Sequence, residues 1–76
     1  MASLPLISSK DAIRAFGKIG YAVHHQRGSH IVLRKAGPPA AHLSIPERKE
    51  LARGTLRGLI RSAGISVEEF VELLKK

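Results

Sequence analysis

The first half of the chain contains side chains suited to acid/base chemistry on a phosphate ester. His30 lies near Arg27, Arg34 and Lys35 in the sequence, two further histidines lie in the same half, and a fourth follows at position 42. Imidazole gains and loses a proton near neutral pH, so it can serve as a general acid or a general base. Guanidinium and ammonium groups hold phosphate and stabilise transition-state charge. RNA supplies its own nucleophile, the 2′-hydroxyl, so these groups would need neither a metal nor a cofactor to cleave it.

Two other interpretations of the histidines stay open. Exposed strand positions need polar side chains, and histidine fills such positions as well as threonine does. Imidazoles from neighbouring strands can also converge on zinc. The sequence has no close-spaced histidine pair of the ligand type and no carboxylate expected on the same face, so we expect no metal site.

Three helices are expected to carry these residues. Ser8 and Asp11 have the spacing of a capping box, and apolar residues then recur at helical spacing. Gly64 is placed to end the second helix, and Ser66 with Glu69 forms a second capping box. The predicted helices span about 9–19, 54–63 and 66–75.

Between the first two helices the apolar period changes to two, which predicts strands. Gly28 and Ser29 form the turn of a hairpin, and the segment around Pro38 and Pro39 breaks the second strand. The predicted strands span about 21–26, 29–35 and 41–45. The order α-β-β-β-α-α predicts an α+β fold, a two-layer sandwich with a three-stranded antiparallel sheet and helices on one face.

Alternation along the strands divides their side chains between two faces. The face toward the helices is predicted to hold Tyr21, Val23, Ile31, Leu33, Ala41, Leu43 and Ile45. The other face is predicted to hold Ala22, His24, His30, Val32, Arg34, His42 and Ser44. His25 has the parity of the helix-covered face but sits at the end of its strand. Three histidines and an arginine are therefore expected to share one open surface.

The length and composition suit one small domain over residues 1–76. The chain has 76 residues, 43% of them hydrophobic, and no cysteine, which excludes disulfides and thiolate zinc sites. No apolar run is long enough to span a bilayer, and the N-terminus lacks the features of a signal peptide. We expect a cytoplasmic protein without a membrane partner.

The positive charge is concentrated in the body of the chain. Residues 1–65 hold eleven Lys and Arg against three acids, a net +8, whereas residues 66–76 have a net charge of −1. Such a body attracts polyanions, nucleic acid first. Arg57 and Arg61 lie one turn apart on the second predicted helix, where they either follow an RNA backbone or are simply solvated.

Several motifs together resemble the HicA family of toxin ribonucleases. They are Ser-Ser-Lys-Asp at 8–11, Gly20-Tyr21, Gly28-Ser29-His30, Ile45-Pro46 and Gly54-Thr55-Leu56, and the similarity covers about residues 5–75. The resemblance implies a fold like the double-stranded RNA-binding domain, an endoribonuclease that cuts mRNA, and neutralisation by a HicB-like antitoxin. It makes His30 the catalytic histidine and Gly28 and Ser29 the turn that presents it.

The family pattern and the residues leave some points open. Many members of the family carry a histidine where this chain has Arg48, and parity makes His24 the first candidate for a second proton-transfer group. We expect Arg27, Arg34, Lys35 and Arg57 to contact RNA. The alternative function is a basic RNA-binding module without catalysis. A third possibility is a docking partner for an acidic regulatory protein. The complex of toxin and antitoxin that the resemblance implies would be of this kind.

Overall fold

A three-stranded antiparallel sheet and three helices make up the described part of the chain. The computed structural model describes residues 3–75. The elements are α1 (Ser9–Gly17), β1 (Tyr21–Arg27), β2 (His30–Lys35), β3 (Ala41–Pro46), α2 (Arg53–Ala63) and α3 (Val67–Lys75). The strands lie in the order β1-β2-β3. The predicted α+β class and element order are confirmed, and none of the described helices is long and apolar enough to cross a bilayer.

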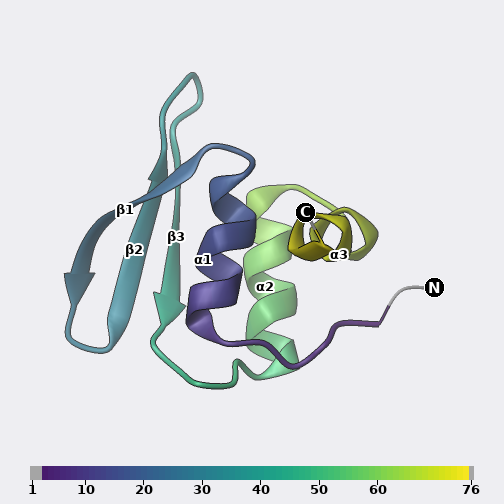
Figure 1. The fold of residues 1–76 in the computed structure, drawn as a ribbon. Coiled ribbons are helices and arrows are strands. Elements are labelled where there is room, and N and C mark those ends of the chain that lie inside the picture. Colours follow the sequence, from purple (N-terminus) through teal and green to yellow (C-terminus); the bar gives the residue numbers. More distant parts are fainter. Residues whose placement is uncertain (1–2, 76) are drawn as a thin grey trace.

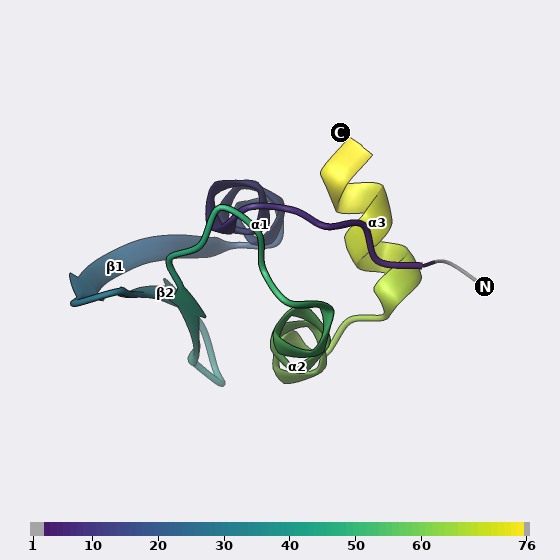
Figure 2. The same cartoon turned by 90° about the horizontal axis from the view of Figure 1, so that it is seen from below.

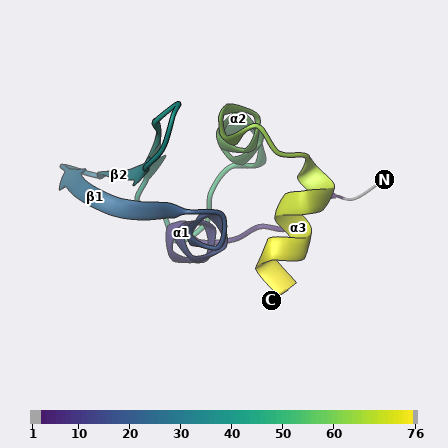
Figure 3. The same ribbon diagram turned by 90° about the horizontal axis from the view of Figure 1, so that it is seen from above.

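The helices all lie on one side of the sheet. Helices α1 and α2 run side by side along one sheet face, and no element within residues 3–75 covers the other face (Figure 1). Helix α3 lies on the far side of α1 and α2 from the sheet, as Figures 2 and 3 show from opposite directions. The open sheet face is therefore available to a large partner, whereas the helix-covered face forms the core.

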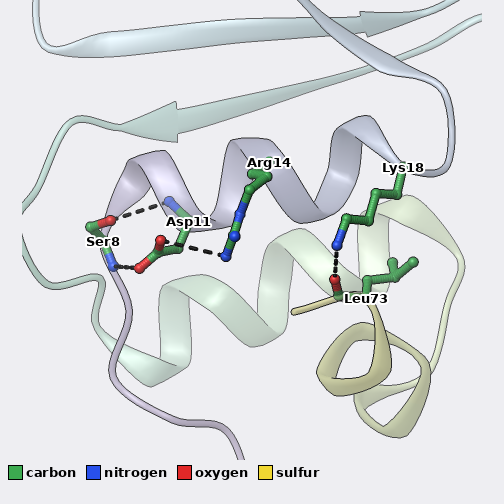
Figure 4. Close-up of polar contacts among 5 residues, drawn as sticks. All are labelled: Ser8, Asp11, Arg14, Lys18 and Leu73. Carbon is green, nitrogen blue, oxygen red and sulfur yellow. Dashed lines mark hydrogen bonds and ion pairs between the residues drawn. The ribbon is translucent and has the colours of Figure 1, made fainter. Parts of the chain in front are cut away.

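Local sequence sets the start and the early end of α1. The Ser8 hydroxyl accepts from the Asp11 N–H at 3.1 Å, and the Asp11 carboxylate accepts from the Ser8 N–H at 3.4 Å, which completes the predicted capping box (Figure 4). The prediction extended the helix to residue 19, but the N–H groups of residues 18–20 bond to the carbonyls three positions earlier. These tighter bonds close the last turn, so the α-helix ends at Gly17.

Helix α2 ends, and helix α3 begins, at the residues that the local sequence signals predicted. Gly64 has φ +75°, the left-handed conformation that glycine adopts at helix C-termini. The Ser66 hydroxyl accepts from the Glu69 N–H at 3.0 Å, and the Glu69 carboxylate accepts from the Ser66 N–H at 2.9 Å. The Lys18 ammonium donates to the Leu73 carbonyl at 2.7 Å, which ties α3 to the end of α1 (Figure 4).

The core lies between the sheet and the helices and continues between the helices. Its largest fully buried side chains are Phe16, Phe70, Leu4, Leu33, Ile45, Leu51 and Leu56. The Phe16 ring lies 5.0 Å from that of Phe70 and 5.9 Å from that of Tyr21, measured between ring centroids. Phe16 thus joins the third helix to the first strand through one aromatic cluster.

Strand β1 contributes less to the core than its alternation predicts. Val23 pairs with Leu33 and so has the expected parity, but it is 55% exposed, and within β1 only Tyr21 is buried. The cause is its position, because β1 is an edge strand that runs past α1 toward the hairpin turn (Figures 1 and 2). Val23 therefore lies on the predicted face of the sheet but is not part of the core.

Candidate active site on the open face of the sheet

The sheet face opposite the helices, here called the open face, collects the histidines. Strand register and contacts place on it Ala22, His24, His25, Arg27, His30, Val32, Arg34, His42 and Ser44. All four histidines and both arginines of this face are exposed to solvent. No carboxylate belongs to the set, so the open face is positively charged.

A tight turn presents His30 at one end of this face. Gly28 and Ser29 connect β1 to β2, with φ +60° at Gly28 and no positive φ at Ser29. Positive φ at the first turn position alone is typical of type II′ turns, which suit the twist of a hairpin. His30 then pairs with Arg27 across the hairpin and with Pro46 on β3. Because Ile31 and Leu33 point into the core, His30 points away from it, as predicted.

A β-bulge in β1 changes the predicted placement of His25. The register passes from Val23 opposite Leu33 to His25 opposite Val32, which leaves His24 as the extra residue. Val32 lies on the open face, so His25 lies there too, and its predicted parity with the core is wrong. A bulge gives one strand two residues where its partner has one and so re-aims the side chains that follow it. Arg27 joins the open face for the same reason.

The bulge brings three side chains into contact. The Nδ1 atoms of His24 and His25 are 2.7 Å apart, and their rings meet edge to face with centroids separated by 4.9 Å. The Arg34 guanidinium approaches Nε2 of His24 at 3.4 Å. Both ring nitrogens of His24 therefore have partners, whereas Nε2 of His25 has none among the described residues.

A buried serine fixes the loop next to the turn. The Ser9 hydroxyl is within hydrogen-bonding distance of the carbonyls of Pro46 (2.8 Å) and Arg48 (2.9 Å), and it accepts from the Arg48 N–H. The loop in turn holds the hairpin, because the Glu47 N–H donates to the Ser29 carbonyl at 2.6 Å. Ser9 thus supports the residue that precedes His30.

The side chain of Gln26 adds a second link between the turn and this loop. Its amide donates to the Gly28 carbonyl and to the Glu47 carboxylate, at 3.1 Å in each case. The roles of Ser9, Gln26 and Glu47 were not predicted from the sequence. The sequence carried a signal for Ser9 alone, because its hydroxyl directly follows the capping residue Ser8.

The predicted RNA-binding residues do not all share a face. Arg27 and Arg34 lie on the open face with His30. Lys35 pairs with Tyr21 and Ala41, on the helix-covered face, and its ammonium lies 5.8 Å from the centroid of the Tyr21 ring. Arg57 is exposed on α2, in the helical layer. The structure places Arg27 directly opposite His30 and Arg34 farther along the same face, and it places Lys35 and Arg57 elsewhere.

A shallow hollow lies on the helix-covered side of the same hairpin end. It is lined by Ser8, Ser9, Lys10, Ile31, Glu47, Arg48 and Lys49. Arg48 is exposed and donates to its neighbour's carbonyl, that of Glu47, at 2.9 Å. Since Ile31 lines the hollow and His30 points to the opposite face, the hollow and His30 do not form one site. Within residues 3–75, no three His, Asp or Glu side chains converge to hold a metal ion.

Comparison with models of protein families gives a match. A family model described as the HicA toxin of bacterial toxin-antitoxin matches residues 9–65. That span runs from the start of α1 to just past the end of α2 and includes the hairpin turn and the whole open face. Helix α3 falls outside it. No curated protein matches the chain.

Proposed function

The chain belongs to the HicA toxin family of bacterial toxin–antitoxin systems, and from this we propose that it is an endoribonuclease that cleaves mRNA without a metal ion. One observation carries the proposal. His30, the residue that the family resemblance makes catalytic, is exposed at the end of a positively charged face and pairs with Arg27 across the hairpin. An imidazole beside a guanidinium on an open surface has the groups needed to act on a phosphodiester.

The proposed reaction is an internal transfer at phosphorus. The 2′-oxygen of one nucleotide attacks the adjacent phosphorus while a base removes the 2′-hydroxyl proton. The bond from phosphorus to the 5′-oxygen breaks, and that oxygen takes a proton from an acid. The products are a 2′,3′-cyclic phosphate and a free 5′-hydroxyl, and no water or redox partner is consumed.

In this reaction His30 moves one of the two protons, and Arg27 holds the phosphate. Gly28 and Ser29 present His30, and the hydrogen bond from Glu47 to Ser29 limits how far the turn can move. Arg34 contributes charge on the same face, while Lys35 and Arg57 would have to contact RNA outside the open face. His24 was the first candidate for the second proton transfer, but both of its ring nitrogens are engaged.

An antitoxin partner follows from the family, and we propose a HicB-like protein in that role. The open face carries arginine and histidine without a carboxylate, so an acidic surface would complement it. RNA and antitoxin would then compete for the same face. A neighbouring reading frame that encodes a HicB-like protein would support this part of the proposal.

The test is incubation of the purified chain with RNA in excess EDTA. We expect cleavage products that end in a 2′,3′-cyclic phosphate. His30→Ala should reduce the rate by about 10²–10⁴-fold, the usual contribution of one general acid or base, while RNA binding persists. His42→Ala is the matched control, because it removes another exposed imidazole from the same face.

Two results would contradict the proposal. Binding without cleavage would favour the alternative function, a basic RNA-binding module that lacks catalysis. Equal losses of rate in His30→Ala and His42→Ala would show that the face acts through its general charge. Growth arrest on expression, relieved by His30→Ala, would support the toxin role in cells.

A further inference from the structure

The contacts among Arg34, His24 and His25 fix which ring nitrogens carry protons. A guanidinium has only donors and keeps its charge, so Nε2 of His24 must accept from Arg34. A neutral imidazole carries one proton, which then resides on Nδ1 of His24. That N–H faces Nδ1 of His25 at 2.7 Å and donates to it. We assign the protons accordingly, with the His25 proton on Nε2.

This assignment gives the two histidines different chemical characters. Both ring nitrogens of His24 are engaged, Nε2 by Arg34 and Nδ1 by His25. His25 has its Nδ1 occupied as an acceptor and directs an Nε2–H away from the pair. A neutral imidazole held in this tautomer donates a hydrogen bond, and it cannot accept a proton at the nitrogen it exposes. Neither ring is therefore arranged as a proton-transfer group.

The register places this donor close to His30. His25 and Arg27 lie two positions apart on β1, so they point to the same face. Arg27 is directly opposite His30, which makes His25 a diagonal neighbour of His30. Diagonal neighbours lie about 7–8 Å apart between Cα atoms, a separation that one phosphate group with its two ester oxygens can bridge.

We propose that His25 Nε2–H and Arg27 form a phosphate-binding subsite beside His30, with His24 and Arg34 as positioning residues. A non-bridging phosphate oxygen would accept from His25, and the guanidinium of Arg27 would supply the charge. The ligand class is a nucleic-acid phosphodiester, which rests on the proposed function. The tautomers rest only on the contacts within the sheet.

The first test measures the tautomers in the free protein. Ring nitrogen shifts of the ¹⁵N-labelled full chain should show the proton on Nδ1 of His24 and on Nε2 of His25. Arg34→Ala and His24→Phe should each cause the His25 ring to average between its two tautomers. The reverse tautomers, or averaging already in the parent protein, would overturn the proposal.

The second test measures binding to an RNA that cannot be cleaved. A short mixed-sequence RNA with methylated 2′-hydroxyls keeps its phosphates and lacks the nucleophile. Removing one hydrogen bond of ordinary net strength should weaken binding about two- to tenfold in His25→Phe and in His24→Phe. His24→Asn, which keeps an amide N–H near the position of Nδ1, should recover part of the loss.

His42→Phe is the matched control for this binding test. It makes the same substitution on the same face, opposite Arg34 on β3, and His42 has no hydrogen bond to Arg34, His24 or His25, so its affinity should equal that of the parent protein. Equal affinities of His25→Phe and His42→Phe would overturn the subsite.

The two proposals can fail separately. Absence of cleavage together with the expected tautomers and binding losses would reject the ribonuclease and support the subsite. Cleavage together with unaltered binding in His25→Phe would reject the subsite and leave the ribonuclease standing.

Discussion

The two faces of the sheet differ in what holds their residues in place. On the helix-covered face, Leu33 and Ile45 are fully buried and are positioned by packing. On the open face, His24, His25 and His30 are exposed and are positioned by a bulge, a turn and a few hydrogen bonds. Packing therefore positions the residues on one side of the sheet, and the bulge and the turn decide which side chains share the other side.

This difference predicts that stability and activity can be separated by mutation. A change on the helix-covered side should unfold the protein before it alters any site. A change on the open face should alter the site in a protein that remains folded. The following substitutions test that separation, beginning with the largest expected effect.

Phe70→Ala should lower the free energy of unfolding by about 3–5 kcal/mol, the usual cost of removing a buried phenyl ring. Its side chain is fully buried and packs on Phe16. His30→Ala, on the open face, should stay within about 0.5 kcal/mol of the parent protein. Urea unfolding followed by circular dichroism measures both. A cost for His30→Ala that approached that of Phe70→Ala would remove the distinction between the faces.

Ser9→Ala should cost about 1–3 kcal/mol, because it removes a buried hydroxyl and leaves the Pro46 carbonyl and the Arg48 N–H without this hydrogen-bond partner. The adjacent Ser8→Ala is the matched control and should cost about 1 kcal/mol as a lost helix cap. Only Ser9→Ala should also reduce cleavage by folded protein, because Ser9 supports the loop that holds the His30 turn. Equal cleavage rates in the two variants would show that the turn does not depend on this loop.

Gly28→Ala should destabilise the protein by about 1–2 kcal/mol, the cost of placing a side chain in the left-handed region. A Cβ at Gly28 would meet no atom within 4 Å, so backbone conformation alone sets this cost. Gly58→Ala should have the opposite effect on stability, because Gly58 lies inside α2, where alanine is favoured. A Cβ at Gly58 would also meet no atom within 4 Å. The substitution should stabilise the protein by about 0.5–1 kcal/mol. Thermal unfolding of the two variants should therefore shift in opposite directions.

The smallest expected effect is on the salt dependence of RNA binding, which should differ between an arginine of the open face and an arginine of the helical layer. If RNA lies on the open face, Arg27→Ala should reduce the magnitude of the slope of log affinity against log salt by about 0.7–0.9. Arg57→Ala, in the helical layer, should leave that slope unchanged unless RNA also reaches α2. Binding titrations of the uncleavable RNA at several salt concentrations measure both slopes. An equal reduction in the two variants would place RNA on both sides of the molecule.

Periodicity and capping rules predicted most of the fold. Alternation identified Leu33, Leu43 and Ile45 as core residues, and all three are buried. Serine and acid spacing located the starts of α1 and α3, and both capping boxes are present. These features depend on neighbours in sequence, which is why the sequence alone was sufficient.

The arrangement of the candidate site depends on contacts between residues far apart in the sequence, so local sequence patterns could not predict it. Nothing in Val23-His24-His25-Gln26 marks a bulge, because the segment has no glycine or proline. The bulge follows from how β1 pairs with β2, and it decides that His25 joins the open face. The contacts of Ser9 join residues 37 and 39 positions apart. The sequence could indicate His30, but it could not indicate what surrounds it.

The bulge has a further consequence for the protein in a crowded solution. An edge strand exposes unpaired N–H and C=O groups and so invites pairing with another chain. β1 is such an edge, and it carries the exposed Val23. By interrupting the regular ladder directly after Val23 and bending the strand, the bulge denies an incoming strand a continuous register. The bulge therefore makes the β1 edge a poorer template for an added strand than a regular edge strand would be.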